Sequence, residues 1–434
     1  MPNLTSFPET FLHYIWKLKL FNFKDLKTSD NKAIRLLNVG VHNHHAGPDF
    51  SNARIRIEDT LWAGSVELHK KSSDWLKHGH QHDAAYNNTI LHVVYEHDQV
   101  IYRSSGEAIP TLELKTRINP QYIRRYWLLL NSKNWIACEA QIVCTSKRME
   151  QLWLNRLVLE RLELKTKEIE QDLVLNQNNW EVSFYHFLAS SFGVKQNIAP
   201  FEALAKSLPL LILSKHKDNL LQLEALLLGQ AGFLADLTSI DKEDTYLKMI
   251  CKEYQFLAHK YQLIPLKASS WKFGRMRPAN FPTIRLAQFA VLVHQSRHLF
   301  SKILEETNVA KLRKMFAIEL KGYWSAHYKL GESSSKRKKS LGSKTVDLIL
   351  INTVVPFLFL FGEKKGLVQY KERALELLQA IQPEQNSIIA NWERLGFVAQ
   401  SAYETQGLLQ LKNNYCEHKR CFSCSIGHKI LRVD

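Results

Sequence analysis

Two neighbouring stretches near the N-terminus constrain the fold most, because both alternate between apolar and polar residues. Residues 53–57 (ARIRI) and 61–70 (LWAGSVELHK) follow the two-residue period of β-strands, and the polar residues 58–60 between them predict a turn. Residues 33–41 and 89–98 are further runs rich in β-branched and apolar residues. The N-terminal part is therefore expected to contain a sheet.

Two segments of helical character flank these strands. Residues 7–21 carry apolar side chains at helical spacing, and residues 73–87 are expected to form a second helix. The predicted order is helix, three strands, helix and strand. This is an α/β core of the αβββαβ type, which we assign to residues 1–120.

From residue 121 onward the pattern changes to long helices. The stretch 149–173 is rich in Leu, Glu, Lys and Arg, which favour helix, and no internal repeat of fixed period is visible. We expect a mainly α-helical domain over residues 121–410 and a short Cys-rich C-terminal tail over residues 411–434. A chain of 434 residues is long enough for about two to three domains.

Three polar residues of the predicted sheet point to metal chemistry. Asp49 follows a Gly-Pro turn at the start of a strand, and Glu67 and His69 share one face of the next strand. Two carboxylates at adjacent strand ends suit Mg²⁺ or Mn²⁺, and such an ion activates water and neutralises phosphoryl charge. His69, or Lys71 two residues further on, is the candidate to orient the water or to stabilise the transition state.

This arrangement resembles the PD-(D/E)XK nuclease superfamily, over the N-terminal part of the chain. The resemblance implies a restriction-endonuclease-like core in which Asp49 and Glu67 bind the metal, assisted by Glu9 on the first helix. His69 stands where that superfamily has a lysine, a departure that bears on catalysis more than on metal binding.

Two further positions match residues of some superfamily members on the second core helix. His82 and Tyr86 lie four residues apart on one face of the predicted helix 73–87. The resemblance implies that they support the catalytic site.

A second resemblance extends over nearly the whole chain. The phrases GPDFSNARI, WAGSVELH, SSDWLKHGHQHD and YNNTILHVVYEHD resemble an uncharacterised bacterial family carried as a domain of unknown function. The phrase WKFGRMRPANFPTIRLAQFA and the cysteine tail fit the same family. This resemblance implies no known activity.

A purely structural interpretation of the same residues stays open. Asp49 can serve as an ordinary turn residue, and Glu67 can pair with Arg54 or Arg56 across the hairpin.

The histidines that follow the second strand are candidate ligands of zinc. On one helix His78 and His82 would align while His80 would point away, so this spacing argues against a zinc site. We expect His78 and His82 to line the cleft instead.

The C-terminal tail predicts a separate structural metal. It contains four residues that can converge on one soft metal: Cys416, Cys421, Cys424 and His428. Zinc is one interpretation. The other is an iron–sulfur cluster, because the C-x4-C-x2-C spacing needs only a distant fourth cysteine, either Cys138 or Cys144.

The charge of the chain favours an acidic partner. Lys and Arg number 58 against 42 for Asp and Glu, a formal charge of +16, which is typical of nucleic-acid binding. Aromatic residues interleave with one group of candidate phosphate ligands: Lys272, Arg275, Arg277 and Arg285. A structural arginine network is an equally weighted alternative for this group, and the basic run 336–339 is interpreted as a solvated loop. DNA is favoured over RNA.

No membrane partner is expected. The most apolar stretch, residues 348–361, is interrupted by polar residues and Pro356, and it is shorter than the ~20 apolar residues of a spanning helix. The N-terminus lacks the pattern of a secretory signal, so a cytoplasmic location is predicted.

The leading hypothesis is a metal-dependent nuclease that hydrolyses nucleic-acid phosphodiester bonds. The alternative is a nucleic-acid-binding or scaffold protein whose nuclease fold has lost catalysis. A third is a metal-dependent hydrolase of a small anionic substrate.

Overall fold

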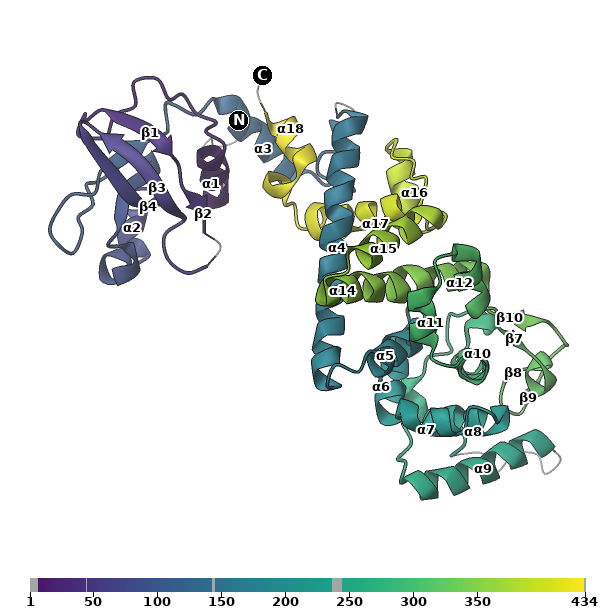
Figure 1. Ribbon diagram of the computed structural model, residues 1–434. Helices are drawn as coiled ribbons and strands as arrows, with labels where there is room; N and C mark the ends of the chain where they lie inside the picture. The colour runs from purple at the N-terminus through teal and green to yellow at the C-terminus, as the bar shows by residue number, and fades with distance from the viewer. Residues whose placement is uncertain (1–6, 44, 143–144, 236–243, 433–434) are drawn as a thin grey trace. The chain divides into compact units, whose positions relative to one another are not determined.

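The structure, a computed structural model, describes residues 7–43, 45–142, 145–235 and 244–432. These residues form two compact units (Figure 1). The N-terminal unit runs to Trp153 and includes the tail from Leu411, whereas the helical unit comprises Leu154–Gln410. The tail, which the sequence suggested as a domain of its own, thus belongs to the unit that contains the sheet.

A six-stranded mixed sheet is the centre of the N-terminal unit. Its strands run along the order β1-β3-β4-β5-β6, with β2 paired to β3. β1, β3 and β4 pair antiparallel, whereas β4, β5 and β6 pair parallel. The strands are β1 (Ile34–Asn38), β2 (Val41–His42), β3 (Phe50–Ile57), β4 (Thr60–Lys71), β5 (Thr89–Glu96) and β6 (Thr111–Glu113). The α/β expectation is confirmed at this level.

Strand β4 is buried on both faces over its second half. Val66 and Leu68 face one side and Glu67 and His69 the other, and all four side chains are buried. A strand in such a position normally carries apolar residues on both faces. The burial of Glu67 and His69 therefore needs an explanation in terms of their partners.

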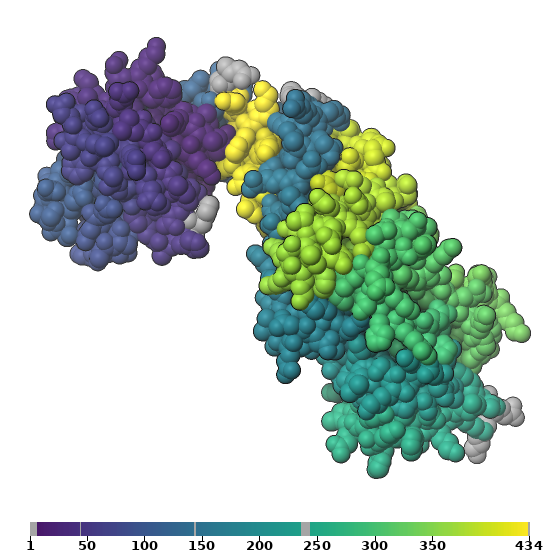
Figure 2. Space-filling view, viewed as in Figure 1, coloured from purple at the N-terminus to yellow at the C-terminus, as the bar shows by residue number. Residues whose placement is uncertain are grey.

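Short helices and the C-terminal tail complete the N-terminal unit. Helix α1 packs against β4 and buries Phe11 and Trp16. Helix α18 of the tail packs against α3 (Figure 1), and the space-filling view shows the yellow tail beside the purple N-terminal part of the same unit (Figure 2). The helices are α1 (Glu9–Lys17), α2 (Asp74–Lys77), α3 (Pro120–Asn131), α18 (Ser425–Leu431), the 3-10 turns η1 (His80–His82), η2 (Ala84–Tyr86) and η10 (Cys421–Ser423), and the π-helix η9 (Leu411–Cys416).

The prediction of one helix over residues 73–87 is wrong. Helix α2 ends at Lys77, and Gly79 adopts a left-handed conformation with φ of +75°. Two separate 3-10 turns, η1 and η2, follow it. A left-handed glycine terminates a helix, so side chains on either side of Gly79 do not follow a helical stripe.

The helical unit surrounds one large apolar core. Asparagine side chains accept hydrogen bonds from the first-turn amides of several helices, which defines where those helices begin. Helix α4 (Lys147–Leu175) enters from the N-terminal unit. The other helices are α5 (Trp180–Phe192), α6 (Ile198–Ser207), α7 (Leu210–Lys215), α8 (Leu220–Gln230), α9 (Thr245–Tyr261), α10 (Pro282–Gln295), α11 (Leu299–Glu305), α12 (Val309–Met315), α13 (Ser343–Ile349), α14 (Val355–Lys365), α15 (Val368–Ala380), α16 (Ser387–Arg394) and α17 (Ala402–Gln410). Four short strands, β7 (Glu319–Leu320), β8 (His327–Lys329), β9 (Glu332–Ser333) and β10 (Lys339–Ser340), form two small sheets.

One apolar stretch of the helical unit, Ser343–Lys365, has the length and composition of a membrane-crossing helix. Its most apolar window is 72% buried inside the protein, as in the core helix of a soluble protein. Pro356 does not break this helix. The π-helical turn Leu350–Val354 lies directly before α14, whose first turn contains Pro356. Proline has no amide donor, and the wider turn accommodates the missing hydrogen bond.

A buried carboxyl group links three elements of the helical unit. Glu224 of α8 is 6% exposed, and it accepts hydrogen bonds from the Tyr246 hydroxyl at 2.9 Å and from the Trp324 indole at 3.0 Å. Burial raises the pKa of this carboxyl to about 7. The pKa in the folded state therefore lies well above the value in the unfolded chain.

We expect the helical unit to lose stability as pH rises from about 4.5 to about 7, because folding then opposes ionisation of Glu224. The loss is at most about 3.5 kcal/mol, at about 1.4 kcal/mol per pKa unit. Glu224→Gln mimics the neutral carboxyl group, because its amide oxygen can accept from the Trp324 indole while its NH2 group donates to the Tyr246 hydroxyl oxygen. It should flatten this pH dependence in urea unfolding monitored by circular dichroism. Glu372→Gln, on the exposed surface of α15, is the control. Equal pH profiles for wild type and Glu224→Gln would contradict the assignment.

Candidate metal centre

The two predicted carboxylates meet where β3 begins beside β4. The Asp49 amide donates to Glu67 Oε2 at 2.9 Å, and the Leu68 amide donates to Asp49 Oδ2 at 3.0 Å. These two hydrogen bonds fix the position of one oxygen atom of each carboxylate. The structural alternative of a pair between Glu67 and the hairpin arginines is not seen, because Arg54 and Arg56 lie opposite other residues, Ala63 and Leu61.

Three histidines complete a group that we call the carboxylate–histidine cluster. Its members are Asp49, Glu67, His69, His78 and His80. The ligand nitrogens of His69, His78 and His80 all lie within 4.8 Å of one another. Glu67 Oε1 lies 3.3 Å from His80 Nε2 and 3.7 Å from His69 Nε2. A single ion can therefore contact one carboxylate oxygen and several imidazole nitrogens.

The turn at Gly79 makes this convergence possible. His78 follows α2 and places Nδ1 3.0 Å from His69 Nε2, whereas His80 lies in η1 and stacks on Tyr86 at 3.8 Å between ring centroids. The expectation that His80 points away from His78 is wrong, because it assumed a continuous helix. His82, which was expected in the cleft, is exposed.

The ionisation of the cluster favours a bound cation. Burial, together with the neighbouring imidazoles, lowers the pKa of His69 to about 2 and that of His92 to about 3. These rings are neutral at pH 7, and a neutral imidazole is the form that binds metals. Burial also raises the pKa of Glu67, and the Asp49 carboxylate adds to this effect. A cation in the cluster would stabilise the ionised carboxylate.

Two buried nitrogens of the site point to a ligand. His13 Nε2 lies 3.2 Å from Asp49 Oδ2, and His80 Nε2 lies 3.3 Å from Glu67 Oε1. Each nitrogen lies within ion-pair distance of that oxygen, but neither contact has the geometry of a hydrogen bond. Buried polar atoms are normally satisfied, so a metal ion or a water bound to it fits this site.

The donor set refines the predicted metal. Mg²⁺ prefers oxygen ligands, whereas imidazole nitrogens suit transition metals. Because the cluster combines carboxylate oxygens with three imidazoles, its residues fit Mn²⁺ or another divalent transition metal better than Mg²⁺.

The remaining predicted site residues do not all lie at the carboxylate–histidine cluster. Glu9 is the first residue of α1, and the residue of α1 that contacts Asp49 is His13, one turn later. Lys71 is exposed at the end of β4, near Glu96. Tyr86 lies beside the cluster through its stacking on His80, and burial raises the pKa of its hydroxyl to about 12.

His13 was not singled out from the sequence. It is a polar residue on a helix whose neighbouring positions, Leu12 and Tyr14, are buried. The sequence signal that could have marked it is an ionisable side chain within the otherwise apolar and aromatic run 11–16.

The predicted basic group of the helical unit divides into two parts. Arg285 is 5% exposed, donates to Asn280 and Gln288, and has a pKa lowered to about 10 by burial. Its guanidinium is therefore part of a structural network and is not available on the surface for a phosphate. The other three cations, Lys272, Arg275 and Arg277, are exposed.

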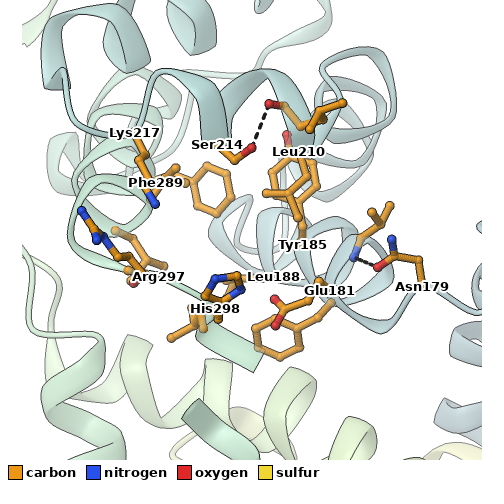
Figure 3. A pocket seen from close by; sticks show the side chains of 17 residues that line it. Asn179, Glu181, Tyr185, Leu188, Leu210, Ser214, Lys217, Phe289, Arg297 and His298 are labelled. Carbon is orange, nitrogen blue, oxygen red and sulfur yellow. Dashed lines mark hydrogen bonds between the residues drawn. The ribbon is translucent and has the colours of Figure 1, made fainter. Parts of the chain in front are cut away.

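The helical unit also contains a cavity of about 410 Å³ (Figure 3). Leu188 and Phe289 contribute apolar surface to it, and Glu181, Lys217 and Arg297 contribute charge. It shares no residue with the carboxylate–histidine cluster.

The chain belongs to a family described as a protein of unknown function, DUF2851, whose model matches residues 9–387. This confirms the family that the phrases within residues 47–290 predicted. The cysteine tail, which was expected to fit the same family, lies outside the match. No curated protein and no solved structure matches the chain.

We expect the full-length protein to bind Mn²⁺ through the cluster and His80→Ala to weaken binding. Loss of even an outer ligand partner costs about 10- to 100-fold in metal affinity, so at least a ~10-fold loss is expected. Isothermal titration calorimetry measures it. His259→Ala, exposed on α9, is the control. Unchanged affinity in His80→Ala would contradict this site.

Proposed function

We propose that the N-terminal unit is a metal-dependent nuclease that hydrolyses phosphodiester bonds of nucleic acid. The single observation that carries the proposal is the burial of Glu67 and His69 on one face of β4, where Asp49, His78 and His80 lie beside them. Burial of ionisable groups is costly unless they are paired or bind a cation, so this arrangement is typical of a functional site.

The topology supports the same class of enzyme. A helix, an antiparallel set of three strands and a parallel fourth strand follow one another as in the PD-(D/E)XK superfamily, whereas the second core helix that the resemblance implies is reduced to the short α2 and two 3-10 turns. Asp49 directly precedes the second of these antiparallel strands, β3, and Glu67 lies on the third, β4. The resemblance assigns metal binding to an Asp and a Glu on two such strands, which supports the proposal.

The residues of the site would have the following roles. The Asp49 amide holds Glu67 Oε2, which leaves Oε1 to the cation together with nitrogens of His69 and His80. A divalent cation bound there lowers the pKa of water and neutralises charge on a phosphoryl oxygen.

His69 takes a role different from that of the superfamily lysine. Its ring is neutral because its pKa is about 2, and its two nitrogens face His92 at 2.8 Å and His78 at 3.0 Å. It therefore acts as a ligand and not as a cationic group. His13, oriented by Asp49, is the residue placed to accept a proton from the attacking water.

The charge distribution supports a nucleic-acid substrate. The chain carries a formal charge of +16, and the exposed Lys272, Arg275 and Arg277 of the helical unit offer contacts to phosphates. Phe273, which follows Lys272 in the sequence, is half-buried.

A second candidate function is nucleic-acid binding without cleavage. The observation that favours it is the buried, neutral His69 at the position where active superfamily members have a lysine.

We expect the wild type to cleave DNA or RNA with Mn²⁺ and Glu67→Gln to lower the rate at least ~100-fold, comparable to losing one group that stabilises transition-state charge. Gel assays with single- and double-stranded DNA and RNA measure this. Glu107→Gln, exposed between β5 and β6, is the matched control. Binding without cleavage would favour the second candidate. Neither binding nor cleavage would reject a nucleic-acid substrate and leave a small anionic one.

We expect His13→Asn to lower the cleavage rate by ~100-fold or more while Mn²⁺ affinity is kept, because general-base groups contribute about 10²–10⁴-fold. Cleavage kinetics and calorimetry on the same preparation measure both quantities. A parallel loss of Mn²⁺ affinity would instead make His13 a metal ligand.

A further inference from the structure

The cavity of the helical unit has an apolar interior (Figure 3). Its walls include Phe184 and Leu188 of α5 and Phe289 of α10, whose side chains are all buried. Tyr185 lines the same cavity, and its hydroxyl donates to the Leu208 carbonyl at 2.9 Å. That hydroxyl is satisfied by the protein, so the tyrosine offers its ring to the cavity. A volume of about 410 Å³ is typical of sites that bind small molecules.

The cavity leaves apolar surface in contact with water. Protein interiors are normally close-packed, and apolar surface contributes to stability only when it is removed from water. At the rim, Leu211 is 65% exposed, and Val293 and Leu299 are only partly buried. An apolar group in the cavity would bury these surfaces.

Two polar side chains of the lining already have partners within the protein. The Ser214 hydroxyl donates to the Leu211 carbonyl at 2.8 Å. Glu181 Oε1 accepts a hydrogen bond from the Ser301 hydroxyl at 3.0 Å. These groups therefore do not need a ligand to satisfy them.

Two cations of the lining are available to a ligand. Figure 3 shows Lys217 and Arg297 on the same side of the cavity. Among the described residues, no carboxylate forms an ion pair with the Lys217 ammonium group. Arg297 lies 3.4 Å from Asp218, but both side chains are mostly exposed, and such pairs contribute little. The His294 ring contacts the Lys217 carbonyl oxygen, which fixes the segment of Lys217 beside the end of α10.

The balance of charge indicates how much negative charge a ligand carries. The lining contains Lys217 and Arg297 against the single carboxylate of Glu181, a formal charge of +1 with His298 counted as neutral. One carboxylate group on the ligand matches this charge. A phosphate monoester, with nearly two negative charges at pH 7, exceeds it.

We propose that this cavity binds a small amphiphilic monocarboxylate, such as the alkyl carboxylate decanoate. Its apolar chain lies against Phe184, Leu188 and Phe289, and its carboxylate contacts Lys217 and Arg297. The cavity lies within the helical unit, so this proposal does not rest on the nuclease function of the N-terminal unit.

The test is isothermal titration calorimetry of the full-length protein with decanoate. We expect saturable binding of one decanoate per chain. Shortening the chain toward hexanoate should weaken binding about 4-fold per methylene, because each buried methylene contributes that much to affinity. Decanol has the same chain without the charge, and it should bind at least ~10-fold more weakly, as expected for loss of a hydrogen-bonded charge.

Two variants locate the ligand. Lys217→Gln should weaken decanoate binding at least ~10-fold and leave decanol binding unchanged, since it removes a charge and not the apolar walls. Val293→Trp places a large side chain in the cavity and should abolish binding of both compounds. Lys248→Gln, exposed on α9, is the control and should bind decanoate as the wild type does.

A wild type that does not bind decanoate would overturn the proposal, and so would equal affinities for decanoate and decanol. Unchanged decanoate affinity in Lys217→Gln would overturn the placement of the carboxylate. Unchanged affinity in a Val293→Trp protein that circular dichroism shows to be folded would overturn the cavity as the site. The wild type and Lys217→Gln decide the outcome even if Val293→Trp does not fold, because Lys217 has no ion pair to lose.

Discussion

The position of β4 between β3 and β5 is the constraint on which the N-terminal unit depends. Antiparallel pairing with β3 brings the start of that strand, and with it Asp49, to Glu67. Parallel pairing with β5 places His92 beside Glu67, where it contacts His69. Since β4 is buried on both faces, its polar side chains must find partners among one another or in a ligand. The carboxylate–histidine cluster follows from this placement.

The same electrostatic principle governs the ionisation of the carboxylate–histidine cluster. Burial raises the pKa of Glu67 and lowers that of His69, so both shifts favour the neutral forms. A bound cation would make the ionised carboxylate favourable again. The residues predicted to bind a second metal, Cys416, Cys421, Cys424 and His428, lie in the same unit as Cys138, whereas Cys144 lies outside the described residues.

Much of the fold and part of the site were accessible from local sequence patterns. The alternation in β3 and β4 predicted the sheet, and the two-residue spacing placed Glu67 and His69 on one face. The helix expected over residues 73–87 failed because Gly79 adopts a left-handed conformation that no apolar period reveals. That error hid the convergence of His78 and His80. In the helical unit, Arg285 of the predicted basic group is buried, whereas the other three cations are exposed. The composition of the segment does not reveal this difference.

The sequence by itself determined the elements with strong local periods, the change from sheet to helices and the candidate ligands Asp49 and Glu67. Only the tertiary structure decided that His13 lies beside Asp49 and that His80 lies beside Glu67. The physical reason is the range of the interactions. Periodicity reports the face of a single helix or strand, whereas a metal site is formed by residues that chain packing brings together from distant positions.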